Sequence, residues 1–263
     1  MESYGSLETH LRKVRSGGRK ILVPYVTAGY SPEWIDTLHH VAAAGADAIE
    51  VGIPFSDPIM DGPVIQAAST MALGRGVTPL SLLSELSSES FDVPLVVMTY
   101  CNLLFHAGIE RFGGWLSEAK VSGTIFPDLP LEESEEWSNY AASKDIDNVM
   151  LVSPVTSEER ARTIASRSRG FVYGIGLMGV TGVRSTLEES ASQIATRLKA
   201  VTDRPVLVGI GISNKDQAHT VGSIADGVIV GSALVKLLIN GGGPQGAFDF
   251  ISSLREGLDE IDG

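Results

Sequence analysis

Eight short apolar runs recur along this chain, and most of them are followed by a helical stretch. The runs lie at residues 21–26, 46–51, 93–99, 123–126, 148–152, 170–175, 205–209 and 225–230. Nearly continuous apolar runs are typical of parallel strands that are buried on both faces, and alternation with helices is typical of α/β proteins. At 263 residues, with no linker-like stretch, the chain predicts one (β/α)8 TIM barrel domain over residues 1–263.

Additional helices are expected around this repeat. The pattern predicts an extra N-terminal helix and inserted helices after the second and eighth strands, at residues 7–14, 64–73, 233–239 and 247–261. Ser31, Thr78 and Ser157 are expected to cap three of the other helices. A doubly wound open sheet is the structural alternative, but no Gly-x-Gly-x-x-Gly follows the first strand, and eight strands favour closure.

Composition excludes several classes of partner. The net charge of −12 disfavours nucleic acid and anionic membranes, and no apolar run is long enough to span a bilayer. Cys101 is the single cysteine, which excludes an intramolecular disulfide and fits a reducing cytoplasm. An anionic substrate must therefore be held by local backbone N–H groups, because the chain as a whole repels it.

One acidic residue interrupts the second apolar run. Glu50 follows Ala48 and Ile49, where a strand buried on both faces should be apolar, and burial should raise the pKa of its carboxyl. Asp61 follows in a polar loop and should ionise more readily. Two acids in different environments suggest divided acid and base roles. The alternatives are a salt bridge for Glu50 and an Asp-Gly turn for Asp61.

In a (β/α)8 barrel, residues at the C-terminal strand ends form the active site. Gly211 and Ser213 after the seventh strand, with Gly231 and Ser232 after the eighth, are expected to grip a phosphate, and Ser232 also to cap its helix. Ordinary turn glycines with a capping serine are the alternative. The candidate site comprises Glu50, Asp61, Tyr100, Asn102, Asp128, Tyr173, Thr181, Gly182, Gly211, Ser213, Gly231 and Ser232.

The residues that a Schiff-base or metal-dependent aldolase requires are not found at the expected positions. No lysine follows a predicted strand, as a Schiff-base aldolase requires, and the histidines are scattered over helices and loops instead of forming a metal site. The glycine-spaced loop 176–182 is expected to act as a lid that excludes water. The sequence thus favours metal-free acid–base catalysis by carboxylates on a phosphorylated substrate.

The run from Glu50 to Gln66 resembles the signature of the tryptophan synthase alpha subunit family. The resemblance covers nearly the whole chain and includes residues 23–29, 98–102, 127–130, 179–182, 209–213 and 231–232. It implies cleavage of indole-3-glycerol phosphate to indole and glyceraldehyde 3-phosphate. Met60 departs from the alanine usual in the family, and residues 176–178 depart from its usual lid.

The resemblance also implies residue roles and a partner. Glu50 would protonate indole C3 and Asp61 would stabilise charge at the indole N–H, while Thr181 would orient Asp61. Gly182, Gly211, Gly231 and Ser232 would hold the phosphate, with Tyr173 beside Glu50. Tyr100 and Ser213 are further expected substrate contacts. The chain would need no cofactor and would pass indole to a pyridoxal-phosphate-dependent beta subunit in an α2β2 complex.

Two alternatives remain open. The chain could be a regulatory subunit that binds a phosphorylated ligand and turns over little, an idea motivated by Met60 and the altered lid. It could also be another phosphate-binding barrel lyase or isomerase with a substrate that contains no indole.

Overall fold

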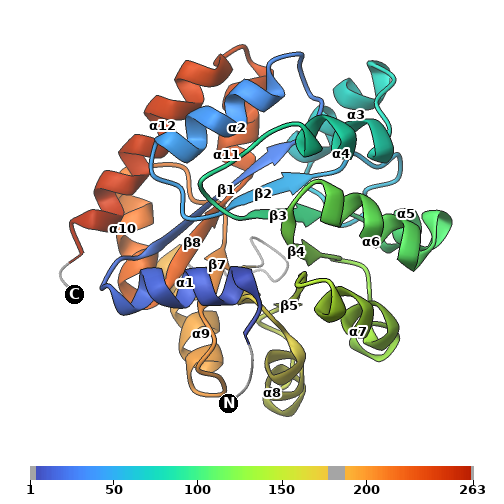
Figure 1. The fold of residues 1–263 in the computed structure, drawn as a ribbon. Helices are drawn as coiled ribbons and strands as arrows, with labels where there is room; N and C mark the ends of the chain where they lie inside the picture. Colours follow the sequence, from blue (N-terminus) through green and yellow to red (C-terminus); the bar gives the residue numbers. More distant parts are fainter. Residues whose placement is uncertain (1–3, 177–186, 262–263) are drawn as a thin grey trace.

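The computed structural model describes residues 4–176 and 187–261 and confirms the predicted barrel. Eight parallel strands pair in sequential order, and β1 closes the sheet by pairing with β8 (Figure 1). The strands are β1 (Ile21–Thr27), β2 (Ile49–Gly52), β3 (Leu95–Met98), β4 (Val121–Ile125), β5 (Asp147–Val152), β6 (Val172–Ile175), β7 (Val206–Gly209) and β8 (Gly227–Val230).

Helices surround the barrel and one helix precedes it (Figure 1). They are α1 (Ser6–Ser16), α2 (Trp34–Ala43), α3 (Pro63–Gly74), α4 (Pro79–Ser87), α5 (Cys101–Ala107), α6 (Ile109–Glu118), the 3-10 helix η1 (Leu131–Glu133), α7 (Glu135–Ser143), α8 (Glu158–Arg167), α9 (Leu187–Lys199), α10 (Lys215–Ile224), α11 (Ser232–Ile239) and α12 (Gly243–Asp259). The N-terminal helix and the insertions after β2 and β8 are confirmed. None of the helices in the described part of the chain is long and apolar enough to cross a membrane.

The predicted helix starts are partly confirmed. Thr78 forms a capping box with Ser81 at α4, and the side chain of Ser157 accepts a hydrogen bond from the first turn of α8. The prediction for Ser31 is wrong, because its hydroxyl accepts the N–H of Glu33 within a turn, so that α2 begins only at Trp34.

Side chains pack in two layers. The outer core lies between the barrel and its helices. The inner cluster fills the barrel and includes Val23 and Val96 within β1 and β3, and Ala48 and Phe171 directly before β2 and β6. Alternate residues of a strand face opposite sides, so these positions also identify which later residues point inward.

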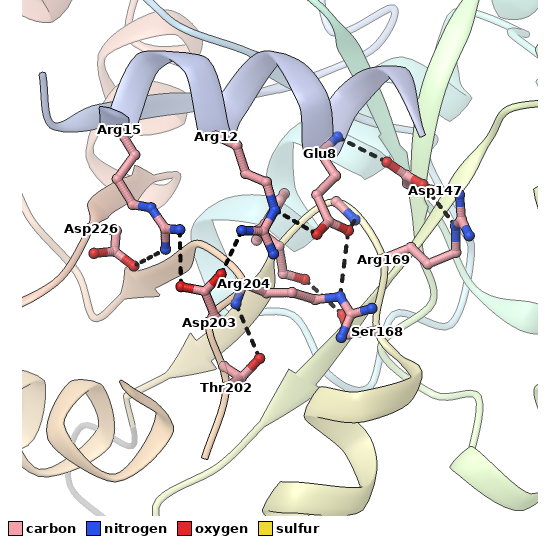
Figure 2. A network of polar contacts seen from close by, with 12 residues as sticks. Glu8, Arg12, Arg15, Asp147, Ser168, Arg169, Thr202, Asp203, Arg204 and Asp226 are labelled. Carbon is pink, nitrogen blue, oxygen red and sulfur yellow. Dashed lines mark hydrogen bonds and ion pairs between the residues drawn. The ribbon is translucent and has the colours of Figure 1, made fainter. Parts of the chain in front are cut away.

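The N-terminal end of the barrel is closed by α1 (Figures 1 and 2). Its fully buried Leu7 and Leu11 join the inner cluster. Figure 2 shows the charged contacts around this plug: Glu8 accepts from Arg12 Nε at 2.9 Å, and its backbone N–H donates to Asp147 at 2.9 Å. Arg169 Nε also donates to Asp147, at 3.0 Å. These buried acids are therefore paired, and they tie α1 to the end of the barrel opposite the predicted site.

Two more aspartates stand at the N-terminal end of the barrel. Asp47 accepts the N–H of Leu22 at the start of β1, and Asp226 accepts the N–H of Val206 at the start of β7, each at 2.9 Å. Each aspartate precedes its own strand and ties it to a neighbouring strand. Their charges are explained by the fold, which leaves Glu50 as the unusual acid.

Candidate active site

Three polar side chains point into the C-terminal end of the barrel. Tyr25, Glu50 and Tyr173 each lie two positions after a residue of the inner cluster in the sequence. Because side chains alternate along a strand, all three face inward, and Tyr25 lies opposite Glu50 in the register of β1 and β2. They form a polar layer above an apolar interior.

Glu50 is buried, and one of its carboxyl oxygens is unpaired among the described residues. The residue is 1% exposed, and among the described residues its Oε2 atom has no hydrogen-bond partner. Burial, followed by the nearby charge of Asp61, raises the pKa of Glu50 to about 8. Within the described chain no ion pair includes Glu50, so the salt-bridge alternative finds no support.

Asp61 occupies the loop between β2 and α3, where its backbone N–H donates to Pro58 O in a turn. Burial raises the pKa of its carboxyl to about 6, and a hydrogen bond from Tyr100 opposes that rise. At neutral pH the pair therefore holds one proton, on Glu50, while Asp61 is ionised. This is the predicted division between the two acids.

A single pocket joins this pair to the predicted phosphate site. A cavity of about 170 Å³ is lined by Tyr25, Glu50, Met60, Asp61, Gly62, Ile65, Met98, Tyr173, Gly209, Gly211, Ile229, Gly231 and Ser232. Gly211 has a φ of +83°, which a residue with a side chain rarely adopts. The N-terminus of α11 opens at Gly231 and Ser232, so its free N–H groups and positive end can bind an anion.

The remaining predicted residues have mixed outcomes. Ser213 does not line this pocket, because its N–H and hydroxyl both donate to Gln217 Oε1 at 2.8 and 2.9 Å. Ser232 is the first residue of α11, and Gly231 holds the cap position, so the prediction that Ser232 caps the helix is wrong. Thr181 and Gly182 lie outside the described residues, as does most of the predicted lid.

Three more candidate residues do not line this cavity. Tyr100 instead contacts Asp61, which does line it. Asp128 accepts hydrogen bonds from the N–H and thiol of Cys101, at 2.9 and 3.1 Å. Asn102 lies within α5, a helix that the sequence pattern did not predict.

Tyr25 is a pocket residue that sequence reasoning missed. A Cβ atom added to Gly52 would lie 1.9 Å from the Tyr25 hydroxyl, and one added to Gly209 would lie 2.7 Å from the Tyr173 hydroxyl. Each phenol therefore occupies space that a glycine on the next strand leaves open. The period-two pattern from Val23 places Tyr25 inside the barrel, but Tyr25 precedes the end of its strand, where a barrel sequence predicts site residues.

A second cavity of about 250 Å³ adjoins the first at Met60. Its apolar wall includes Phe126, Leu129 and Ile175, and Arg160 lies at its polar side. Met60 therefore lies between the acid pair and this second cavity at the ends of β4, β5 and β6.

Known proteins share this sequence and fold. The profile of the family described as "Tryptophan synthase alpha chain" matches residues 11–247. A tryptophan synthase alpha chain from Prochlorococcus marinus (strain MIT 9313) is 44% identical over 241 residues, covering 89% of this chain and 87% of the relative. One from Synechococcus sp. (strain CC9902) is 43% identical, covering 98% and 99%.

Solved structures agree with these relatives. A structure of Mycobacterium tuberculosis tryptophan synthase is similar with a TM-score of 0.89 and 36% identity, covering 97% of this chain and 99% of that one. The tryptophan synthase alpha chain from Legionella pneumophila subsp. pneumophila has a TM-score of 0.88 and 33% identity, covering 99% and 100%.

Proposed function

This chain belongs to the tryptophan synthase alpha chain family, and we propose that Glu50 and Asp61 carry out its reaction. That reaction is the cleavage of indole-3-glycerol phosphate to indole and glyceraldehyde 3-phosphate, so the chain is a carbon–carbon lyase. One observation carries the assignment of residues: both carboxyls and the glycines that would bind phosphate line the same cavity.

Glu50 supplies and then recovers the proton. Because burial keeps its carboxyl protonated at neutral pH, it can protonate indole C3. The resulting carboxylate then accepts the proton of the glycerol hydroxyl next to the ring. The carbon–carbon bond breaks, its electron pair returns to the ring, and Glu50 ends the cycle with its proton restored.

Asp61 stabilises the charge between these two steps. Protonation at C3 leaves a positive charge that is shared with the indole nitrogen, and an ionised carboxylate accepting the N–H lowers its energy. The order of the two pKa values, about 6 for Asp61 and about 8 for Glu50, gives each acid the form that its role requires. Tyr173 lies beside Glu50 and contributes to the wall of the pocket.

The glycerol phosphate would lie at the other end of the cavity. Gly211 and Gly231 allow the backbone to approach the phosphate closely, and Ser232 adds a hydroxyl at the first turn of α11. Gly182, outside the described residues, remains a proposed contact from the resemblance. Ser213 is not retained among the proposed direct contacts because Gln217 already occupies its donors.

The partner that we propose is a tryptophan synthase beta subunit in an α2β2 complex. Supporting this, large apolar side chains are exposed in the loops and helices that follow the C-terminal strand ends: Ile59 and Val155 are each 82% exposed, with Met60 and Phe105 also exposed. Exposed apolar side chains such as Met60, which also lines the pocket, favour protein contact at this end of the barrel. Pyridoxal phosphate would belong to that partner and no cofactor to this chain. Residues 1–263 would act as a single domain in the cytoplasm.

The proposal is tested by supplying indole-3-glycerol phosphate to the chain, alone and with a beta subunit, and measuring both products. Glu50→Gln and Asp61→Asn should each lower kcat by roughly 10²- to 10⁴-fold. Glu136→Gln, which removes an exposed carboxylate on α7, is the control. Ligand binding without product in either condition would favour the regulatory alternative, and wild-type turnover by Glu50→Gln would refute the acid–base assignment.

A further inference from the structure

Within the described part of the chain, the loop that carries Asp61 makes few hydrogen bonds to the barrel. It runs over residues 53–62 without regular secondary structure. Its first N–H, on Ile53, donates to Met98 O at 2.9 Å, and near its end Gln66 Nε2 donates to Asp61 O at 2.9 Å. Asp61 therefore needs a support between these points if its carboxylate is to hold a fixed direction.

Tyr100 supplies that support from the corner between β3 and α5. Its ring stacks on Phe55 with the ring centroids 5.0 Å apart. Its hydroxyl accepts the N–H of Met60 at 3.0 Å and also makes a side-chain hydrogen bond with Asp61. Among the described residues, no other hydrogen bond joins residues 54–61 to the loop of a different strand.

The two hydroxyl contacts fix where the phenolic proton lies. The N–H of Met60 can only donate, so the hydroxyl oxygen accepts there and directs its own proton toward Asp61. Burial, followed by the charge of Asp61, raises the pKa of Tyr100 to about 12, so the phenol keeps this proton throughout the ordinary pH range.

The corner that carries Tyr100 is itself held in place. Tyr100 occupies the cap position of α5, and the next residue, Cys101, donates its N–H and its thiol to Asp128 at 2.9 and 3.1 Å. Asp128 belongs to the loop after β4. The strand ends of β3 and β4 thus fix Tyr100, which in turn fixes the loop after β2.

We propose that Tyr100 is a positioning residue that directs the Asp61 carboxylate into the catalytic pocket and keeps it ionised. This inference takes the catalytic role of Asp61 from the proposed function, whereas the contacts of Tyr100 are independent of that function. Tyr100 acts through Asp61 and not on the substrate, because it does not line the cavity. The titratable groups that face Asp61 within the described chain are Glu50 from β2, Tyr25 from β1 and Tyr100 itself.

The test is Tyr100→Phe, which keeps a ring to stack on Phe55 and removes both hydroxyl contacts. Losing the hydrogen bond should raise the pKa of Asp61 above about 6, so the acid limb of the kcat/KM profile should move to higher pH. Misdirection of the carboxylate should also lower kcat by roughly 10- to 100-fold. Tyr30→Phe is the matched control, because this buried tyrosine also loses one hydroxyl contact, to Thr37, on α2 outside the pocket.

A second measurement does not depend on activity. Carbon-13 NMR of aspartate carboxyls would follow the titration of Asp61 directly, with the Asp61→Asn variant identifying its signal. If Tyr100→Phe raises this pKa while Tyr30→Phe does not, the positioning role stands even if the wild-type chain releases no indole, an outcome that refutes only the proposed function. An Asp61 titration that Tyr100→Phe leaves unchanged would overturn the positioning role, whether or not the wild type is active.

Discussion

Replacing the buried acid of the pocket should make the protein more stable while it loses activity. In the folded chain the pKa of Glu50 is about 8, against an ordinary value of 4.5. Between these pH values the unfolded chain has released the proton and the folded chain retains it, so the folded state loses stability as the pH rises. Glutamine has nearly the same shape and no charge to bury, so Glu50→Gln removes this dependence.

The magnitude follows from the difference between the two pKa values. Each pKa unit corresponds to about 1.36 kcal/mol, so the burial of the charge costs the wild type about 3 kcal/mol at pH 7 and about 5 kcal/mol above pH 8.5. Well below pH 4.5, the ordinary pKa of the carboxyl, both states are protonated and the cost vanishes. In a domain of this size, about 5 kcal/mol corresponds to a rise in Tm on the order of 10 °C.

The assay is thermal unfolding followed by circular dichroism at pH 5, 7 and 8.5, for the wild type, Glu50→Gln and the exposed control Glu136→Gln. The melting temperature of Glu50→Gln should exceed that of the wild type only slightly at pH 5. This excess should be larger at pH 7 and largest at pH 8.5. Other titrating groups are common to all three proteins and cancel in the comparison. Parallel melting temperatures for wild type and Glu50→Gln across this range would refute the reasoning.

Three further outcomes are expected. A bell-shaped kcat/KM profile, with apparent pKa values near about 6 and about 8 for the pair, should appear in steady-state kinetics, because turnover needs ionised Asp61 and protonated Glu50. Gly211→Ala, at a φ of +83°, should raise KM several-fold, whereas Gly18→Ala, at +81° and far from the pocket, should cost similar stability in melting experiments with KM unchanged. Asp147→Asn should lower the free energy of unfolding by about 3 kcal/mol and leave kcat unchanged, as measured by urea denaturation and indole release, because it unpairs charges at the opposite end of the barrel.

The barrel could be predicted because its sequence signal extends over runs of several residues. A buried parallel strand must be apolar over several residues, and eight such runs leave few architectures. Single helix boundaries depend on one or two hydrogen bonds, which sequence patterns do not determine. The hydroxyl of Ser31 could cap a helix or accept a hydrogen bond within a turn. In the structure it accepts the N–H of Glu33 in a turn.

The acid pair could be predicted for the same kind of reason. Glu50 contradicts its surroundings, and Asp61 lies in a loop whose place on the barrel follows from the topology. Tyr25 does not contradict its strand, since tyrosine is common in strands, and its importance emerges only from the space beside Gly52. Likewise, Ser213 looked free to bind phosphate because its bonds to Gln217 depend on side-chain geometry.

The plug formed by α1 has a consequence for how the chain is made. This helix leaves the ribosome before any strand, yet Asp147 and Asp203, which bind it, follow by 139 and 191 residues. The side chains of Leu7 and Leu11 therefore remain exposed to solvent until most of the polypeptide has been synthesised. Although α1 is translated before all eight strands, it is thus among the last of the described elements to reach its final place, and chaperones that shield apolar helices have a long opportunity to bind it.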